Sequence, residues 1–485
     1  MRLSLISACF VMAVLAVGKN GLAQEGSSVS SYVIFSTATQ QGAKLADSTR
    51  SYTIRNIYIT GNKRTHPDII LRELPFSVNE NYSIEAIRDH FAAAKKLLMN
   101  TGLFRGVVVT LQQGSDADVF VNITVDEKWY VWPKPYLRTV DKTFHQWWNE
   151  KNRNMNRINY GMKITHNNFT GRNDKLKVNF MNGYTRQLSV QYYGLFLDNE
   201  LKWSINGGFW AGKNREVNYM TQEDKLVSFK HNDDYLRTYF SWFAEVNYRP
   251  AIKTTHSLGM SFNYENVADT VSRLNPDFYS GHRTIRYPEM QYKMSYFDVD
   301  FIPYPTRGFI GEVILRRRGI NSPVNLWQLT AKGSKTWPIN QNYFFNASAV
   351  GMVKLPLKQP YVGRQFIGHE NQYLQGYEYY VIDGVAGAYS KATLTRRIVK
   401  TNIGIPSKRF PKLNTIPLKI YAKTFLNAGY VYNHADDGSR LSNSFLYSGG
   451  VGFDIVVFTD FVVKIEWSFN RLGENGLYLH KRNCF

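Results

Sequence analysis

From about Tyr130 to its C-terminus, the chain alternates between apolar and polar residues in segments of about ten residues. In residues 461–470 the apolar set is Val463, Ile465, Trp467 and Phe469, and the set between them is Lys464, Glu466, Ser468 and Asn470. Successive side chains of a β-strand point to opposite faces of its sheet. Each segment therefore predicts a strand with one apolar and one polar face, as in a barrel that meets lipid outside and water inside.

Between residues 130 and 482 about sixteen such segments can be counted, an even number as bacterial barrels have. We expect short periplasmic turns at 168–173, 198–200, 249–255 and 303–307, and long outer loops at 213–238, 268–284 and 356–386. The predicted fold class is a membrane β-barrel of about 16 antiparallel strands over residues 129–485. A soluble β-sandwich would also alternate, but the 15% aromatic content and the terminal Phe485 favour the barrel.

The N-terminal region has the pattern of an exported protein. Residues 1–23 are typical of a secretory signal peptide, with Arg2 before an apolar stretch and small residues at Gly21 and Ala23. Residues 24–51 are rich in Ser, Thr, Gly and Gln and predict a flexible leader. No later stretch reaches the ~18 apolar residues of a membrane helix. Loss of the signal peptide would leave Cys484 as the single cysteine, so we expect no intramolecular disulfide.

The chain is strongly basic, with 59 Lys and Arg against 38 Asp and Glu, a formal net charge of +21. In a soluble protein such a charge would suggest nucleic acid. Here the basic residues alternate with apolar ones along strand-like segments and do not cluster on one helix or tail. We therefore expect a basic lumen or a rim that faces lipopolysaccharide, and no nucleic-acid partner.

Residues 52–128 predict a small α/β domain of the order β-α-α-β-β. The segments IRNIYITGNKRTHPDIILREL, AAAKKLLMNTGLFRGVVVTL and VFVNITVDEKW resemble a POTRA domain. The recurring features are the glycine after the first strand, the Arg-Thr start of the first helix and the Gly-Leu-Phe exit from the second. One such unit fits in the sequence.

Several barrel segments resemble the BamA/TamA superfamily, also called the bacterial surface antigen family. Residues 167–172 (NNFTGR) resemble its early Asn-x-x-Gly turn. A second match is an Asp-x-x-Asp strand end followed by a Pro-Thr-x-Gly turn, here carried by Asp298, Asp300, Pro305 and Gly308. The resemblance implies a periplasmic turn at this point, where Pro fixes φ and Gly relieves the tight return.

In that family a loop motif, Val/Ile-Arg-Gly-Phe/Tyr, folds into the lumen and its Arg pairs with the Asp of a Phe-x-Asp-x-Gly strand. This chain has Gln375, Gly376 and Tyr377 at the loop motif and Asn427 at the Asp position, so both charges are absent together. We predict that Gln375 contacts Asn427 through an amide–amide hydrogen bond, worth about 1 kcal/mol net. The alternative is that the loop stays outside and both residues are ordinary polar positions.

The first predicted strand, residues 130–139, contains Pro133 and Pro135. Proline cannot donate to a strand ladder and belongs at edges or bulges. The segment is either a weak edge strand, as a laterally opening seam would need, or a linker before the true first strand.

Motifs of catalysis are missing from the sequence. There is no Gly-x-Ser-x-Gly, no Cys/His metal spacing and no phosphate loop. We expect no enzyme activity, no cofactor and no metal.

The resemblance implies a protein of the outer membrane, with its POTRA domain in the periplasm, that inserts β-barrel proteins or exports a polypeptide. The expected partners are unfolded outer-membrane or secreted polypeptides, outer-membrane lipids including lipopolysaccharide, and accessory lipoproteins. A client strand would pair with the POTRA edge, for which Phe104, Val107 and Val109 are the candidates, and then pass to the barrel seam. The alternative is a non-translocating barrel that serves as a structural subunit or a passive channel.

Overall fold

The structure is a computed structural model that describes residues 51–114, 117–139, 158–231, 233–320, 322–369, 372–404, 415–435, 438–457 and 461–480. The predicted signal peptide lies outside the described residues, and so does the predicted leader except for Ser51. Both cysteines also lie outside them.

The N-terminal domain is a four-stranded sheet covered by helices. Its elements are β1 (Ser51–Thr60), α2 (Pro67–Leu71), β2 (Asn81–Ser83), α3 (Ile84–Asn100), β3 (Phe104–Gln113) and β4 (Asp118–Glu127). The strand order is β2-β1-β4-β3, with β1 parallel to β4 and the other pairs antiparallel. The sequence prediction lacked β2, because a three-residue strand is too short to show an alternating pattern.

Helix α3 is amphipathic and capped. The Ser83 hydroxyl accepts a hydrogen bond from the amide of Ala86 at 3.2 Å and so satisfies one of the free N–H groups of the first turn. Ile87, Ala94 and Leu98 are buried on one face, at the spacing that places side chains along a single helical stripe.

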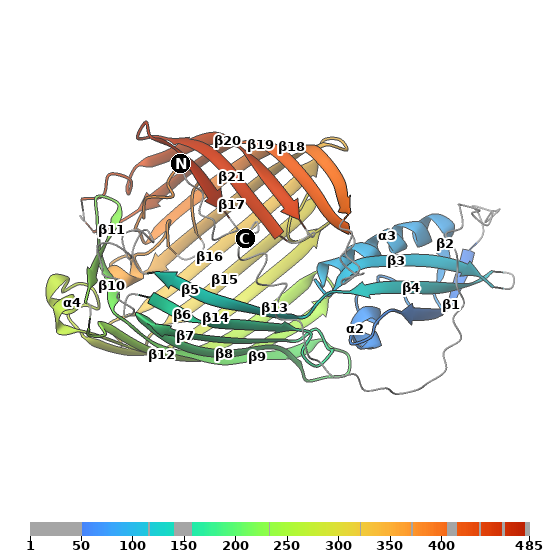
Figure 1. The fold of residues 1–485 in the computed structure, drawn as a ribbon, viewed down its shortest axis with the longest axis horizontal. Helices are drawn as coiled ribbons and strands as arrows, with labels where there is room; N and C mark the ends of the chain where they lie inside the picture. The colour runs from blue at the N-terminus through green and yellow to red at the C-terminus, as the bar shows by residue number, and fades with distance from the viewer. Residues whose placement is uncertain are drawn as a thin grey trace. The chain divides into compact units, whose positions relative to one another are not determined.

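The second domain is a 16-stranded antiparallel sheet that curves into a barrel (Figure 1). Its strands are β5 (Val131–Thr139), β6 (Ile158–Asn167), β7 (Lys175–Gly183), β8 (Thr185–Phe196), β9 (Trp203–Asn214), β12 (Arg237–Ala251), β13 (Thr254–Val267), β14 (Thr284–Val299), β15 (Gly308–Arg318), β16 (Leu326–Pro338), β17 (Tyr343–Leu355), β18 (Ala386–Gly404), β19 (Thr415–Tyr432), β20 (Phe445–Val457), β21 (Phe461–Asn470) and β22 (Asn475–His480). The predicted barrel fold and strand number are confirmed.

The two faces of the barrel strands differ as the alternation predicts. In β21, Trp467 and Phe469 are 48% and 47% exposed on the outer face, whereas Glu466 and Ser468 are buried on the inner face. Large apolar side chains on an open surface meet lipid in a membrane barrel, and the polar set lines the lumen. Separately, the helices in the described part of the chain are all too short or too polar to span a membrane.

The first and last strands each have one ladder partner among the described residues. β5 pairs with β6 from Val131 to Thr139, and β22 pairs with β21. The described residues contain no ladder between β5 and β22. The segment with Pro133 and Pro135 is therefore a strand at a sheet edge and not a linker, which is where proline is tolerated.

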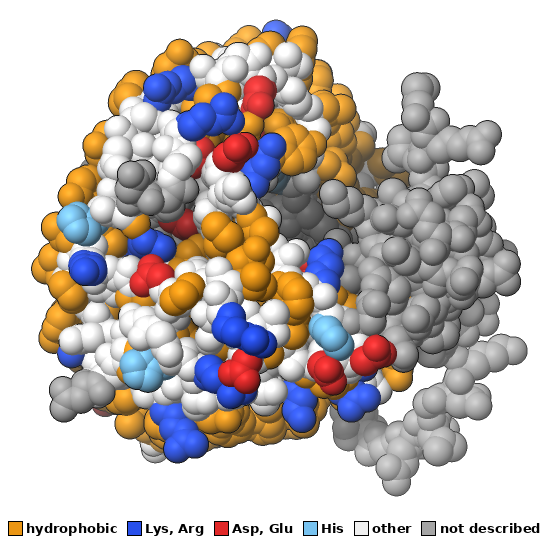
Figure 2. All heavy atoms as spheres, turned by 90° about the vertical axis from the view of Figure 1, so that its left-hand side faces the viewer, with side chains coloured by type: hydrophobic (Ala, Val, Ile, Leu, Met, Phe, Trp, Pro, Cys, Tyr) orange, Lys and Arg blue, Asp and Glu red, His pale blue; other side chains and the backbone are white. Residues whose placement is uncertain are grey.

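The long outer connections contain structure that the sequence pattern did not predict. A hairpin of β10 (Glu216–Gln222) and β11 (Lys225–Lys230) lies in the first of them, α4 (Asp269–Leu274) in the second and a 3-10 turn, η3 (Tyr361–Gly363), in the third. These elements share a buried apolar cluster that includes Val217, Val271, Phe278, Tyr279 and Tyr361. Figure 2 faces this end of the sheet and shows Lys and Arg side chains interspersed with Asp and Glu, without a single basic patch.

Candidate functional site

The connection between β17 and β18, residues 356–385, packs against the inner face of the barrel. Its apolar residues Leu374, Tyr377 and Ile382 are buried in one cluster with Tyr389 of β18 and Val431 of β19. These apolar side chains do not face lipid, so packing against the inner barrel wall is what removes them from water. The loop therefore enters the lumen, which the family resemblance implied.

Gly376 allows the tip of this loop to approach the wall closely. Its φ is +90°, in the region that favours glycine, and an added Cβ would lie 3.0 Å from Ser448 Cβ and 3.2 Å from the carbonyl oxygen of Phe469. Asn470 Nδ2 donates to the Gly376 carbonyl at 2.8 Å. The Tyr377 hydroxyl donates to the carbonyl of Tyr447 at 2.9 Å.

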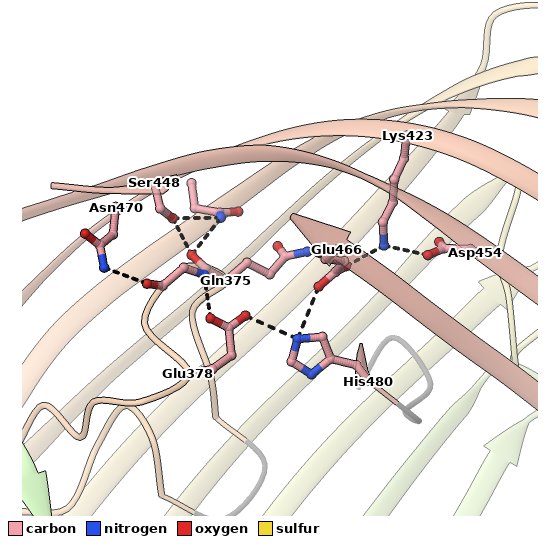
Figure 3. Close-up of polar contacts among 10 residues, drawn as sticks. Gln375, Glu378, Lys423, Ser448, Asp454, Glu466, Asn470 and His480 are labelled. Carbon is pink, nitrogen blue, oxygen red and sulfur yellow. Dashed lines mark hydrogen bonds and ion pairs between the residues drawn. The ribbon is translucent and has the colours of Figure 1, made fainter. Parts of the chain in front are cut away.

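Gln375 is held by both its main chain and its side chain (Figure 3). Its carbonyl accepts from Ser448 Oγ at 2.5 Å and from Asn427 Nδ2 at 3.5 Å. Its side-chain Nε2 donates to Glu466 Oε1 at 2.8 Å. Strands β19, β20 and β21 thus all contact one residue of the loop tip.

The structure brings Gln375 and Asn427 together, but not by the amide–amide hydrogen bond that we expected. The Asn427 amide binds the Gln375 main chain and Ser448 Oγ, at 3.0 Å to the latter, and its Oδ1 has no partner among the described residues. The Gln375 amide binds Glu466 instead. A charged acceptor makes a stronger hydrogen bond than a neutral amide, which explains the different pairing.

A buried ion-pair network lies beside this contact, and the sequence analysis missed it. Lys423 Nζ lies 2.5 Å from Glu466 Oε1 and 2.6 Å from Asp454 Oδ1. All three residues are less than a tenth exposed. Lys423 and Glu466 flank Gly452 on one rung of the sheet, and a Cβ there would lie 3.2 Å from Glu466 Cγ. A glycine between opposite charges at matching positions of three strands is the signal that could have revealed it.

The predicted turn motif between β14 and β15 forms a compact, inward-packed turn. Asp300 accepts from the amides of Thr306 at 2.9 Å and Arg307 at 3.1 Å. Gly308 has a φ of +114°, and an added Cβ would lie 2.0 Å from the Asp298 carbonyl oxygen.

The residues before the turn's end reach the barrel interior. Pro305 is buried. Tyr304 is also buried, packs on Tyr421 with ring centroids 4.7 Å apart and donates to Asp454 Oδ2 at 2.8 Å. The turn is therefore linked to the same ion-pair network as the loop tip.

Ion pairs join the N-terminal domain to the ends of barrel strands β12 and β14. Arg249 makes a two-pronged contact with Glu73, at 2.5 and 2.8 Å, and Lys96 Nζ lies 2.7 Å from Asp298 Oδ1. Burial raises the pKa of the Glu73 carboxyl, but the hydrogen bonds and charges of Arg249 and Arg72 outweigh it and hold that pKa below its ordinary value. Glu73 is therefore ionised at neutral pH.

Main-chain contacts reinforce the same junction. The Arg64 guanidinium donates to the carbonyls of Asn168 and Phe169, at 3.2 and 2.8 Å, in the NNFTGR turn. Asn100, the last residue of α3, donates to the Val299 carbonyl at 3.0 Å and accepts from the Ile302 amide at 3.0 Å. Each turn that carries a family-like motif thus contacts the N-terminal domain.

The predicted client-binding residues lie on an edge strand. β3 is at one end of the four-stranded sheet and pairs with β4 alone among the described residues. Phe104 and Val107 are buried in the domain core, and Val109 is half-buried, so their side chains are not open to a client. Val108, which the sequence analysis did not single out, is 55% exposed.

Comparison with protein families gives a match for the N-terminal domain. The POTRA model, described as "Surface antigen variable number repeat", matches residues 52–128. Comparison with curated proteins finds no relative of similar sequence.

Solved structures of similar fold cover most of the chain at low identity. BamA from Haemophilus ducreyi lacking POTRA domains 1–3 is 13% identical with a TM-score of 0.48, covering 90% of this chain and 84% of that one. CdiB from Acinetobacter baumannii is 11% identical with a TM-score of 0.45, covering 88% and 73%. CdiB from Escherichia coli is 10% identical with a TM-score of 0.45, covering 92% and 91%.

A barrel with an apolar outer face behind a POTRA domain defines the class: an outer-membrane β-barrel whose POTRA domain lies in the periplasm. The residues that match the POTRA model form one domain, and the barrel follows it directly in the chain. The architecture that the sequence motifs implied is confirmed in both the N-terminal domain and the barrel.

Proposed function

We propose that the protein assembles or translocates polypeptides at the outer membrane. The observation that carries this proposal is three sheet edges that have no second partner among the described residues: β3 of the POTRA domain, and β5 and β22 of the barrel. An exposed edge presents main-chain N–H and C=O groups that can pair with an extended client strand of almost any sequence.

The client would first add to β3 of the POTRA domain. Main-chain hydrogen bonds supply the affinity in this mode of recognition, which suits clients of diverse sequence. The exposed Val108 supplies an apolar contact beside that edge. The ion pairs of Glu73 with Arg249 of β12 and of Lys96 with Asp298 of β14 hold the domain at this end of the barrel, so a client released from β3 is close to that end.

Within the barrel the client would meet the edges of β5 and β22. The two prolines of β5 have no N–H group to donate to a neighbouring strand. The strand therefore makes fewer hydrogen bonds, which lowers the free energy needed to exchange one strand partner for another. Outer-membrane lipids, including lipopolysaccharide, would contact the apolar outer face, and accessory lipoproteins would bind the POTRA domain.

Client capture can be tested by placing a photo-crosslinking residue at Val108 in the full chain. We expect crosslinks to unfolded outer-membrane or secreted polypeptides. The control is Lys95, which is exposed on α3 and does not belong to the edge strand. Equal crosslinking at both positions would contradict recognition through the edge.

A structural subunit without transport activity is the second candidate. It is favoured by the loop tip, whose hydrogen bonds to three strands and proximity to a buried ion-pair network fix it inside the barrel. A passive channel is the other form of this alternative, and single-channel conductance in planar bilayers tests it. A large steady conductance would favour the channel, and a closed or flickering one the transporter.

A further inference from the structure

Three side chains that can ligate a metal ion converge where the inward loop meets the last two strands. Glu378 comes from the loop, Glu466 from β21 and His480 from β22 (Figure 3). One ligand atom from each lies within 4.8 Å of the others. The side chains are 11%, 0% and 14% exposed respectively, so the group is shielded from bulk solvent.

The spacing of these atoms fits a small metal ion. His480 Nε2 lies 3.2 Å from Glu378 Oε1 and 3.2 Å from Glu466 Oε2. Ligands about 2.0–2.1 Å from a tetrahedral Zn²⁺ are separated from one another by about 3.3 Å. His480 Nε2 is therefore already at about this ligand–ligand distance from both carboxylates.

A second observation points to a missing ligand. Glu466 is fully buried, and its Oε2 makes no hydrogen bond among the described residues, although His480 Nε2 lies 3.2 Å from it as an ion-pair contact. This oxygen faces His480, while Lys423 and Gln375 both bind the other oxygen, Oε1. The same imidazole nitrogen faces Glu378 Oε1 at 3.2 Å, so one N–H serves two carboxylates, and a cation among the three groups would satisfy both.

The neighbouring side chains hold two of the ligands in place. The Tyr373 ring stacks on the His480 ring, with centroids 4.7 Å apart and an interplanar angle of 26°. Glu378 Oε2 accepts from the Gly376 amide at 2.8 Å, which leaves Oε1 directed at His480. Such outer contacts orient metal ligands and are a regular part of metal sites.

We propose that Glu378, Glu466 and His480 bind a divalent transition-metal ion of the Zn²⁺ class. One imidazole and two carboxylates suit Zn²⁺ and similar ions, whereas Ca²⁺ takes six to eight oxygen ligands and Mg²⁺ a near-octahedral shell. The Lys423 ammonium is the nearest competing cation, but Asp454 pairs with it. The bound ion ties the loop tip to β21 and to the last strand of the barrel.

Metal binding itself does not depend on the proposed transport function. It can be tested with the untagged full chain in detergent micelles, stripped by a chelator. Co²⁺ is titrated and followed by its visible absorption, and Zn²⁺ is then added to displace it. We expect one ion per chain, a Co²⁺ spectrum that Zn²⁺ abolishes, and no competition by Ca²⁺ or Mg²⁺.

Substitutions assign the site. Glu378→Gln and His480→Asn should each weaken Zn²⁺ binding at least about tenfold. His256→Asn is the control, because His256 in β13 contacts Tyr292 and is not part of the group. Glu378 lies in a loop, so the Glu378→Gln variant tests the proposal even if His480→Asn disturbs β22. Heat-modifiable electrophoretic mobility shows whether each variant is folded.

Three results would overturn the proposal. These are a wild-type chain that binds neither Co²⁺ nor Zn²⁺, a Glu378→Gln variant with wild-type affinity, and preferential binding of Ca²⁺.

Discussion

Lys423 and Glu466 face each other across Gly452 in the barrel interior, with Nζ 2.5 Å from Oε1. The same carboxylate oxygen accepts the Gln375 amide of the inward loop. The loop tip is therefore anchored at a buried charge, with Gln375 at the position where the motif it resembles has an arginine. Its position depends on a lysine–glutamate pair within the barrel wall.

Removing one partner of this pair should destabilise the barrel strongly. Lys423→Met leaves Glu466 and Asp454 buried without their shared cation, and an uncompensated buried charge costs about 3–5 kcal/mol. We expect a lower urea midpoint for loss of the heat-modifiable folded band. The control is Lys332→Met, because Lys332 lies on the inner face of β16 and pairs with Glu312 outside this network, with its side chain 25% exposed. A Lys423→Met variant as stable as wild type would show that the network contributes nothing.

Gly376→Ala should loosen the loop tip. At a φ of +90°, with Ser448 Cβ 3.0 Å from the new methyl group, the substitution imposes strain of about 1–3 kcal/mol. We expect faster cleavage within residues 356–385 when the folded protein is treated with protease. Gly351→Ala is the control, since a Cβ at Gly351 meets nothing within 4 Å and its φ is ordinary. Equal cleavage rates in both variants would contradict the close approach.

The POTRA–barrel junction should weaken in acid. The pKa of Glu73 is lower in the junction than in a free glutamate, so its ion pair with Arg249 contributes fully above the ordinary glutamate pKa of about 4.3. That contribution is lost as the pH falls through the lower pKa of the folded state. Hydrogen exchange in α2, measured as the pH is lowered, should show increased opening only in this range.

Glu73→Gln should remove this acid transition and weaken the junction at neutral pH as well. Glu85→Gln is the control, because Glu85 is exposed in the first turn of α3. An acid transition that persists in Glu73→Gln would assign it to another group.

The barrel strands could be predicted because their pattern is a simple one. Apolar and polar residues alternate with a period of two in the barrel strands, so β21 was predicted with its observed ends. β2, β10 and β11 were missed because they are short strands within polar connections, where alternation has too few residues to be recognised.

The candidate site was only partly predictable. The alternation of side chains along its strand placed Asn427 on the inner face, and the resemblance placed Gln375 in the inward loop. Their proximity could therefore be predicted. The partner of the Gln375 side chain could not be predicted, because Glu466 is brought to it only by the register of β19, β20 and β21. The group of Glu378, Glu466 and His480 has no local spacing, so a search for metal motifs along the sequence misses it.

Depleting the protein and quantifying the outer-membrane and secreted proteins of the cell tests the proposed function most directly. Barrel proteins of the outer membrane, or at least one secreted polypeptide, should fall in abundance while their unfolded forms accumulate in the periplasm. The wild-type gene should restore them. Unchanged levels of every outer-membrane and secreted protein would contradict assembly and translocation and favour a non-translocating barrel.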